Sequence, residues 1–228
     1  MSQERRASPS KAGEAPARAI AIDTERTARG PRRRRTFFKR EFEMRKSDID
    51  PMPPYFERYI NLVADVELPD AFDESARQLI SLDEGLFTAL DGQRYAPGKW
   101  TVKETLQHLI DWERILSYRA LLYARNKGSA SQDVDGDLFA ANMNAERRTI
   151  GELVGELMAV RASTQAMFDS FDERTLLNTG TNWKYEISVL AMGFTIIGHQ
   201  IHHLKIIEEK YHPLLGGIGA TVGTPPPA

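Results

Sequence analysis

The sequence predicts an all-α protein whose main domain is a four-helix bundle. Apolar residues recur every three or four positions through four long segments between residues 70 and 211, which is the period of an amphipathic helix. Stretches of moderate length that contain Gly, Pro and Asp separate these segments. No window alternates apolar and polar residues between turn signals, so no strand is expected.

Apolar spacing alone predicts the first and third helices. A short helix near residues 55–63 precedes a first long helix at about 70–90, which Asp91-Gly92 ends. The third helix is expected over about 137–170, with an apolar stripe along one side. A loop over about 172–186 should follow it.

The second and fourth helices also carry start signals. Thr101 and Glu104 form a capping box, the pattern T-x-x-E, which opens a helix that reaches about Asn126. Ser188 is a suitable N-cap for the last helix, which is expected to end near Tyr211, before a proline. Four helices with such connections predict a bundle.

Charge and composition divide the chain into three parts. Residues 1–48 contain 14 Lys and Arg against 7 Asp and Glu, whereas the remainder has 16 basic and 25 acidic residues. We expect a disordered basic extension over 1–47, the bundle over 48–215 and a flexible Gly- and Pro-rich tail over 216–228. Met44 is a plausible alternative start of the chain.

The basic run Arg32 to Arg35 leaves two interpretations open. Such a run can contact nucleic acid or an acidic membrane surface, or it can be a solvated tail, which is the more common case. The excess of acidic residues in the rest of the chain disfavours contact between the bundle and phosphate. Nucleic acid is therefore not expected as a partner except through this tail.

Composition also excludes several classes of function. The chain has no cysteine, so disulfides, thiolate nucleophiles and cysteine-ligated metals are ruled out, and any reactive thiol must come from a cofactor or substrate. No run of about 18 apolar residues could span a membrane, and no signal-peptide pattern occurs at the N-terminus. A cytoplasmic location is the expectation.

Three histidines form the candidate metal site. His199 and His203 are four residues apart in the pattern H-x-x-H-H, so they occupy one face of the last helix and can share an ion. His108 is expected on a partly apolar face of the second helix. Three neutral imidazoles suit Zn, Ni or Fe and leave a coordination position open for water or substrate.

A simpler interpretation remains open, because a lone histidine on an apolar face is more often a core residue than a ligand. His202 lies about 100° around the helix from His203 and is expected outside the ligand set. Asp111 and His202 are the candidates for moving protons, and Glu113 and Gln200 are further polar groups nearby in sequence. Each is also explained as an ordinary polar residue of a helix surface.

Two motifs resemble those of the DinB-like superfamily of metal-binding bundles. Tyr95–Glu104, followed by Leu106–Asp111, is similar to the segment that carries the first ligand in that superfamily. Gly198–Leu204 is similar to the segment that carries the second and third. Many relatives have an acid where Gln200 stands, which weakens any proton-transfer role at that position. The resemblance covers about 48–215.

The resemblance implies an up-up-down-down bundle, often dimeric, with a nickel-, zinc- or iron-type site. It also implies a small-molecule substrate and, for an enzyme, a transferase acting with a low-molecular-weight thiol such as bacillithiol or mycothiol, or a related hydrolase. The alternative is a metal-binding stress-response protein without turnover. No membrane partner is expected.

Overall fold

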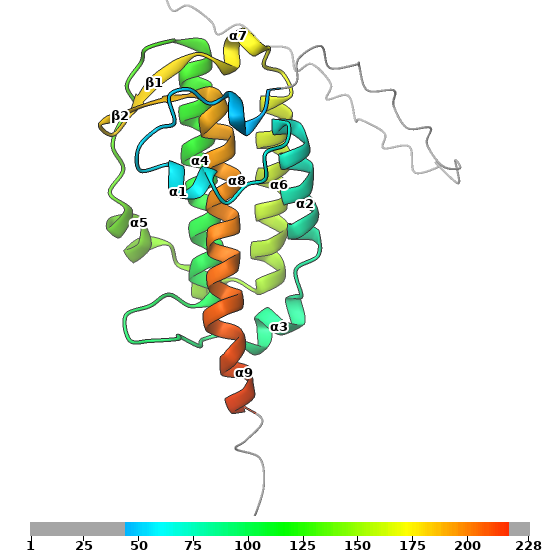
Figure 1. Cartoon of the computed structure of the whole chain (residues 1–228). Helices are drawn as coiled ribbons and strands as arrows, with labels where there is room; N and C mark the ends of the chain where they lie inside the picture. The colour runs from blue at the N-terminus through cyan, green and yellow to red at the C-terminus, as the bar shows by residue number, and fades with distance from the viewer. Residues whose placement is uncertain (1–43, 219–228) are drawn as a thin grey trace, which may run out of the picture. The chain divides into compact units, whose positions relative to one another are not determined.

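A bundle of four long helices forms the body of the protein in the computed structural model, which describes residues 44–218 (Figure 1). These helices are α2 (Leu68–Ile80), α4 (Val102–Arg125), α6 (Ile150–Phe168) and α8 (Val189–Ile206). The predicted fold class is confirmed. No helix of the described part is long and apolar enough to cross a membrane.

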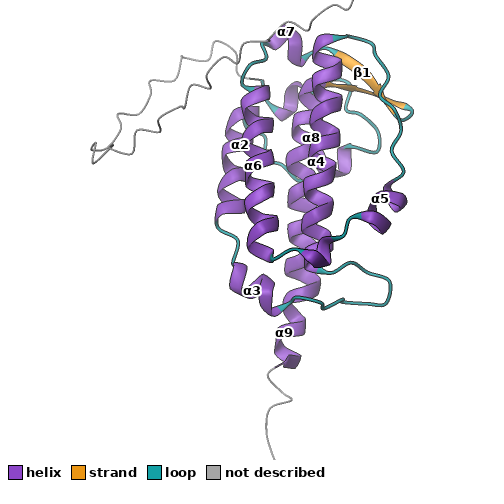
Figure 2. Cartoon of the chain, turned by 180° about the vertical axis from the view of Figure 1, so that it is seen from behind, coloured by secondary structure: helices purple, strands orange, loops and turns teal. Residues whose placement is uncertain are grey.

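Parallel pairs of helices make up the bundle. Helix α4 lies between α6 and α8, and α2 closes the ring by packing on the same two neighbours (Figures 1 and 2). α2 and α8 run in one direction, and α4 and α6 run in the other. The order around the ring is therefore up-up-down-down, whereas along the chain it is down-up-up-down.

Side-chain caps start the helices that carry the candidate site. Thr101 Oγ1 accepts a hydrogen bond from Glu104 N, and the Glu104 carboxylate accepts one from Thr101 N, which confirms the predicted capping box. Ser188 Oγ accepts from Ala191 N at the start of α8. These caps fix where each helix begins and hence which residues face inward.

The first and third predicted helices are each broken. The first divides into α2 and α3 (Glu84–Ala89), because the Asp83 carboxylate accepts a hydrogen bond from Leu86 N and starts a new helix. The third divides into α5 (Gly136–Asn142), a 3-10 turn η2 (Ala145–Arg147) and α6. Asn144 has a positive φ of 51°, and Thr149 forms a second capping box with Glu152.

Strands were not expected but are present. A short helix α7 (Glu173–Leu176) leads into an antiparallel hairpin of β1 (Thr179–Asn182) and β2 (Tyr185–Ser188). The expectation of an irregular loop over 172–186 was therefore wrong. The hairpin also anchors the segment that follows α4, through hydrogen bonds between Ser129 and Thr181 and between Ser131 and Thr181.

Smaller elements complete the chain. A 3-10 turn η1 (Lys46–Asp48) and a one-turn helix α1 (Glu57–Ile60) precede α2. After α8 the chain continues through a π-helical turn η3 (Ile207–Tyr211) into α9 (His212–Ile218), so the expected end near Tyr211 was wrong. Pro213 lies in the first turn of α9, where a residue without a backbone N–H is tolerated.

A polar network crosses the centre of the apolar core. Arg161 of α6 forms a two-pronged ion pair with Glu113 of α4, with both N–O distances at 2.8 Å, and both side chains are buried. Arg161 Nη1 also donates to Ser75 Oγ of α2, and Gln200 Nε2 of α8 donates to the Ser75 carbonyl at 3.0 Å. Each long helix contributes one residue, so the network specifies the relative register of all four.

Candidate metal centre

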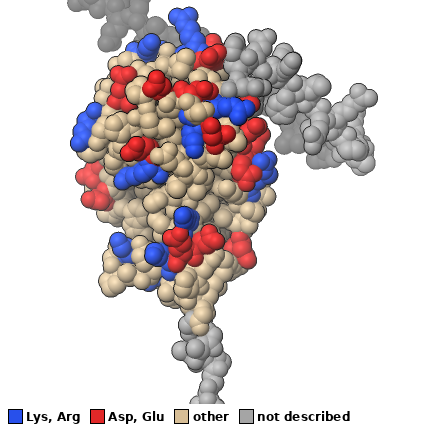
Figure 3. Space-filling model, in the orientation of Figure 1, with Lys and Arg blue, Asp and Glu red and all other residues tan. Residues whose placement is uncertain are grey.

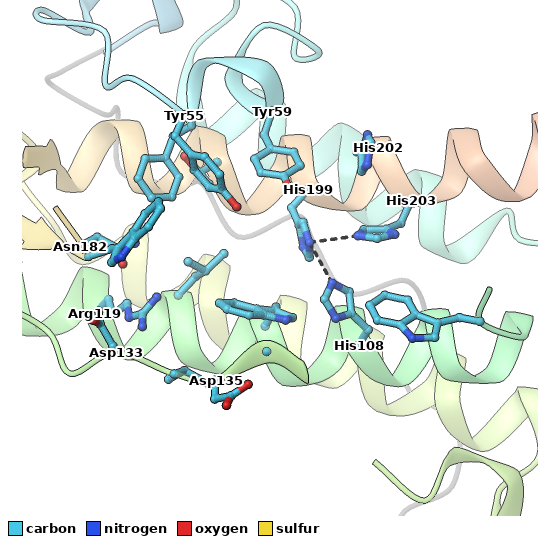
Figure 4. Close-up of a pocket in the computed structure, with 18 residues that line it drawn as sticks. Tyr55, Tyr59, His108, Arg119, Asp133, Asp135, Asn182, His199, His202 and His203 are labelled. Carbon is cyan, nitrogen blue, oxygen red and sulfur yellow. Dashed lines mark hydrogen bonds between the residues drawn. The ribbon is translucent and has the colours of Figure 1, made fainter. Parts of the chain in front are cut away.

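The three predicted histidines meet between α4 and α8. His108 lies in the second turn of α4, and His199 and His203 lie one turn apart on the face of α8 that packs on α4. His199 Nε2 is 3.2 Å from His108 Nε2 and 3.1 Å from His203 Nε2 (Figure 4). All three rings thus offer a nitrogen to the same small volume, within 4.8 Å of one another.

Burial keeps these imidazoles neutral. It lowers the pKa of His108 to about 4 and that of His203 to about 3, with a smaller lowering from neighbouring histidines. His199 is 8% exposed, and burial holds its pKa well below the ordinary value. Because a neutral imidazole has a lone pair to share, the site presents its nitrogens in the form that metals bind.

Aromatic rings hold the histidines in place. Trp100, which precedes the cap of α4, lies over His108 with ring centroids 4.5 Å apart and stacks on His203 at 6.3 Å. Tyr211 OH donates to the Trp100 carbonyl and fixes the loop that carries this indole. Tyr59 makes T-shaped contacts with His199 and His202, with ring centroids 5.3 and 5.4 Å apart.

A glycine admits Tyr59 to this position. Helix α1 packs directly on α8, and a Cβ atom added at Gly198 would overlap the carbonyl group of Tyr59. No larger residue fits there without displacing α1. The glycine immediately before His199 is therefore explained by close backbone approach, which brings the Tyr59 ring over the histidines.

The histidines line one end of a large cavity. Its volume is about 820 Å³, and its walls come from α1, α4, α8, the hairpin and the segment between α4 and α5. Figure 4 shows the histidines at one end, Arg119, Asp133 and Asn182 at the other, and the Tyr55 ring along the side between them. A small molecule can therefore reach the three nitrogens.

The other polar candidates separate into two groups. His202 lines the cavity beside His203, with ring centroids 5.0 Å apart, and burial lowers its pKa. Asp111 does not line the cavity; its carboxylate accepts a hydrogen bond from Gln107 Nε2 at 2.9 Å. Glu113 and Gln200 belong to the core network on the far sides of α4 and α8.

Apart from the histidines, sequence reasoning assigned none of the cavity residues to the site, among them Tyr59, Trp100, Arg119 and Asn182. The position of Arg119 could have been predicted, because it follows His108 by eleven residues, which is close to three full helical turns, and therefore lies on the same face of α4. Trp100 lies within the Tyr95–Glu104 motif, but its contact with the histidine rings depends on the path of the loop. Tyr59 and Asn182 come from distant segments that only the folded chain brings together.

Comparisons with known proteins agree with this architecture. A search of curated proteins finds no match. Among solved structures the chain is similar to YfiT from Bacillus subtilis, described as a probable metal-dependent hydrolase with an unusual four-helix bundle topology. The two share 16% identity with a TM-score of 0.53, over 70% of this chain and 87% of that one. At this identity the likeness shows the fold alone.

The family comparison covers the bundle and its histidines. The model of the DinB superfamily matches residues 71–207, from the first turn of α2 to the residue after the end of α8. That stretch is more than half of the chain and includes the three converging histidines. The chain belongs to the DinB superfamily.

Proposed function

We propose that His108, His199 and His203 hold one divalent metal ion and that the protein is a metal-dependent enzyme acting on a small molecule. The observation that carries the proposal is the convergence of three Nε2 atoms at the end of a cavity. Nitrogen ligands about 2.0–2.1 Å from a tetrahedral ion lie about 3.3 Å apart. The separations of 3.1 and 3.2 Å are close to that spacing without an ion.

Three protein ligands leave a position open to the cavity, as catalytic sites require. An ion of the Zn, Ni or Fe type would there lower the pKa of a bound thiol or water and so supply a nucleophile at neutral pH. The neutral form of His202 can accept the released proton, because its ring lies beside His203 and lines the cavity.

The favoured nucleophile is a low-molecular-weight thiol, in a transferase reaction. The two carboxylates that line the cavity, Asp133 and Asp135, lie away from the histidines, so neither is placed as a general base for water. A thiol needs less help from a base, since its ordinary pKa is several units below that of water. Hydrolysis is the second candidate, and the description of the YfiT neighbour favours it.

The metal proposal is tested by elemental analysis of the purified protein and of single His→Ala variants. Replacement of His108, His199 or His203 should abolish stoichiometric metal. His202→Ala and His212→Ala are the matched controls and should retain it. A wild-type protein that binds no divalent ion after incubation with zinc, nickel or iron(II) would overturn the proposal, as would a His203→Ala variant that stays fully loaded.

The choice of nucleophile is tested on the metal-loaded protein. We expect consumption of a small thiol together with a model electrophile, such as 1-chloro-2,4-dinitrobenzene, to depend on the metal. Metal-dependent cleavage of model esters or amides without thiol would favour hydrolysis instead. A loaded protein inactive in both assays would favour the non-catalytic metal-binding alternative. Dimer formation is a separate prediction, which sedimentation of the loaded protein would check.

A further inference from the structure

Arg119 is a buried cation that lines the cavity. Only 5% of the residue is exposed, and it lies three helical turns after His108 on the same face of α4. Of its guanidinium N–H groups, Nη2 donates to the Gln132 carbonyl at 2.9 Å. Among residues 44–218 no carboxylate is within ion-pair distance of Arg119, so most of its donors remain without a protein acceptor.

A second unused donor lies at the same end of the cavity. Asn182, at the end of β1, is 2% exposed, and its Nδ2 atom is buried with no hydrogen-bond partner in the described part of the chain. Figure 4 shows Arg119 and Asn182 together at the end remote from the histidines. Buried donors are normally paired, so the unpaired Nδ2 atom of Asn182, together with the unfilled donors of Arg119, indicates an absent acceptor.

The space between this end and the histidines is largely apolar. Trp112 and Leu116 line the α4 wall between His108 and Arg119, and Phe56 and Val134 line other walls. The eleven residues from His108 to Arg119 correspond to about 16 Å along the helix axis. A molecule that reaches from one end to the other must be elongated, with an apolar middle.

We propose that Arg119 and Asn182 form a carboxylate-binding subsite, which holds the anionic end of an elongated substrate whose reactive group lies at the histidines. The placement of the reactive group rests on the proposed metal site; the subsite itself does not. A carboxylate offers two oxygens in a plane, which match the fork of a guanidinium, and it can also accept the amide N–H of Asn182.

The charges around Arg119 agree with such a ligand. Burial lowers the pKa of Arg119, which reflects the free-energy cost of moving a cation out of bulk water. The exposed carboxylate of Asp133, which also lines the cavity, acts on the pKa of Arg119 in the opposite direction. Asp133 offsets part of that cost but leaves the guanidinium donors unfilled, so an incoming carboxylate would complete the pairing.

The test uses a carboxylate and its neutral analogue on metal-stripped, full-length protein. Isothermal titration calorimetry should show that 6-phenylhexanoate binds at least about tenfold more tightly than 6-phenylhexanamide, since a buried charge-assisted hydrogen bond changes Kd by that order. Arg119→Gln should abolish the preference. Arg125→Gln, a change of an exposed arginine on the same helix outside the cavity, should retain it.

Circular dichroism checks that each variant is folded. If Arg119→Gln does not fold, Asn182→Asp replaces it: the added carboxylate should weaken binding of the acid by at least about tenfold and leave the amide unchanged. Equal affinities of acid and amide in the wild-type protein, or a preference that survives both substitutions, would overturn the subsite. A preference that persists in a protein unable to bind any metal would leave the subsite standing and the metal proposal refuted.

A double-ended probe tests the span on zinc-loaded protein. Suberic acid monohydroxamate carries a metal-binding hydroxamate and a distal carboxylate, whereas octanohydroxamate ends in a methyl group. The first should bind at least about tenfold more tightly, and Arg119→Gln should remove that difference. If the two bind equally although the stripped protein still prefers 6-phenylhexanoate, the subsite does not serve a substrate anchored at the histidines.

Discussion

Burial determines how the three histidines respond to acid. The sequence alone gives an ordinary imidazole pKa near 6.5, so acid release of metal would be expected around that pH. In the fold, burial lowers the pKa to about 4 for His108 and to about 3 for His203. Protons therefore compete with a metal only at lower pH than the sequence suggests.

We expect the loaded protein to keep its metal down to about pH 5 and to lose it as pH falls further. Equilibrium dialysis at a series of pH values, followed by metal analysis, measures this. The metal-free protein should lose stability as pH falls from 6.5 towards 4, because the unfolded chain takes up protons in that range while the folded chain does not. Metal loss centred on pH 6.5 would mean that the rings are open to water.

At the scale of single elements, the one-turn helix α1 can pack close to the histidines only because α8 has a glycine, Gly198, where the two helices meet. Gly198→Ala should displace α1 and the Tyr59 ring, at a cost of about 1–3 kcal/mol in unfolding free energy, a range typical of overpacking. Urea denaturation measures the loss. The control is Gly155→Ala in α6, where no atom lies within 4 Å of the added Cβ and a gain of up to about 1 kcal/mol is expected.

The capping box of α4 provides a second prediction for an element. Thr101→Ala should cost about 1 kcal/mol in stability and reduce zinc affinity only slightly, because fraying stops before the second turn, where His108 lies. Thr149→Ala removes the matching cap of α6, a helix that carries none of the three histidines, and should cost a similar amount with no effect on zinc. Thermal denaturation and zinc titration give both quantities; unchanged stability of Thr101→Ala would show that another group caps α4.

Local signals explain which elements could be predicted from the sequence. The caps at Thr101 and Ser188 depend on neighbouring residues, and both are correct. Thr149 with Glu152 carries the same T-x-x-E signal, but the apolar stripe of the third helix concealed it. The hairpin had no such signal, since its turn contains Trp183 and Lys184 in place of the Asn-Gly pair that usually marks one.

Some residues of the candidate site could also be predicted from local sequence, whereas the positions of others depend on tertiary contacts. Ligand spacing on α8 follows from the helical period, so His199 and His203 could be paired from sequence. The partners of Glu113 and Gln200 could not, because Arg161 and Ser75 reach them from other helices. Tertiary contacts decide whether a polar residue beside a ligand faces the cavity or the core.

At the scale of the whole molecule, the four-helix network predicts how the bundle resists mutation. Arg161→Leu would leave the Glu113 carboxylate buried without its partner and should cost about 3–5 kcal/mol. The double variant Glu113→Leu/Arg161→Leu should be more stable than Arg161→Leu alone, since no unpaired charge remains. Urea denaturation of the wild type, Arg161→Leu and the double variant measures these differences in stability. A double variant less stable than Arg161→Leu would show that the leucines cannot pack in place of the ion pair.

The distribution of charged side chains over the molecular surface indicates whether the bundle could bind nucleic acid. On the face shown in Figure 3, Lys and Arg side chains of the described residues are interspersed with Asp and Glu, so this face offers no continuous basic surface to phosphate. The run Arg32 to Arg35, for which contact with nucleic acid or an acidic membrane was one of two interpretations, lies outside the described residues. Retention on DNA that disappears on deletion of residues 1–43 would identify that run as the contact.

The same deletion tests the division of the chain into domains, which remains a prediction. A protein that starts at Met44 should keep the melting temperature and metal content of the full chain. Met44 itself should be needed, because its side chain is buried in the core and its carbonyl accepts a hydrogen bond from Leu68 N at the start of α2.

A second truncation, starting at Asp50, provides the control. It removes Met44 and Ile49 from the core, together with the hydrogen bond from Lys46 Nζ to the Val63 carbonyl, and should melt several degrees lower. Calorimetry compares the three proteins. If the Met44 protein melts as low as the Asp50 protein, residues before Met44 contribute to folding, and the boundary of the bundle lies further towards the N-terminus than the change in composition suggests.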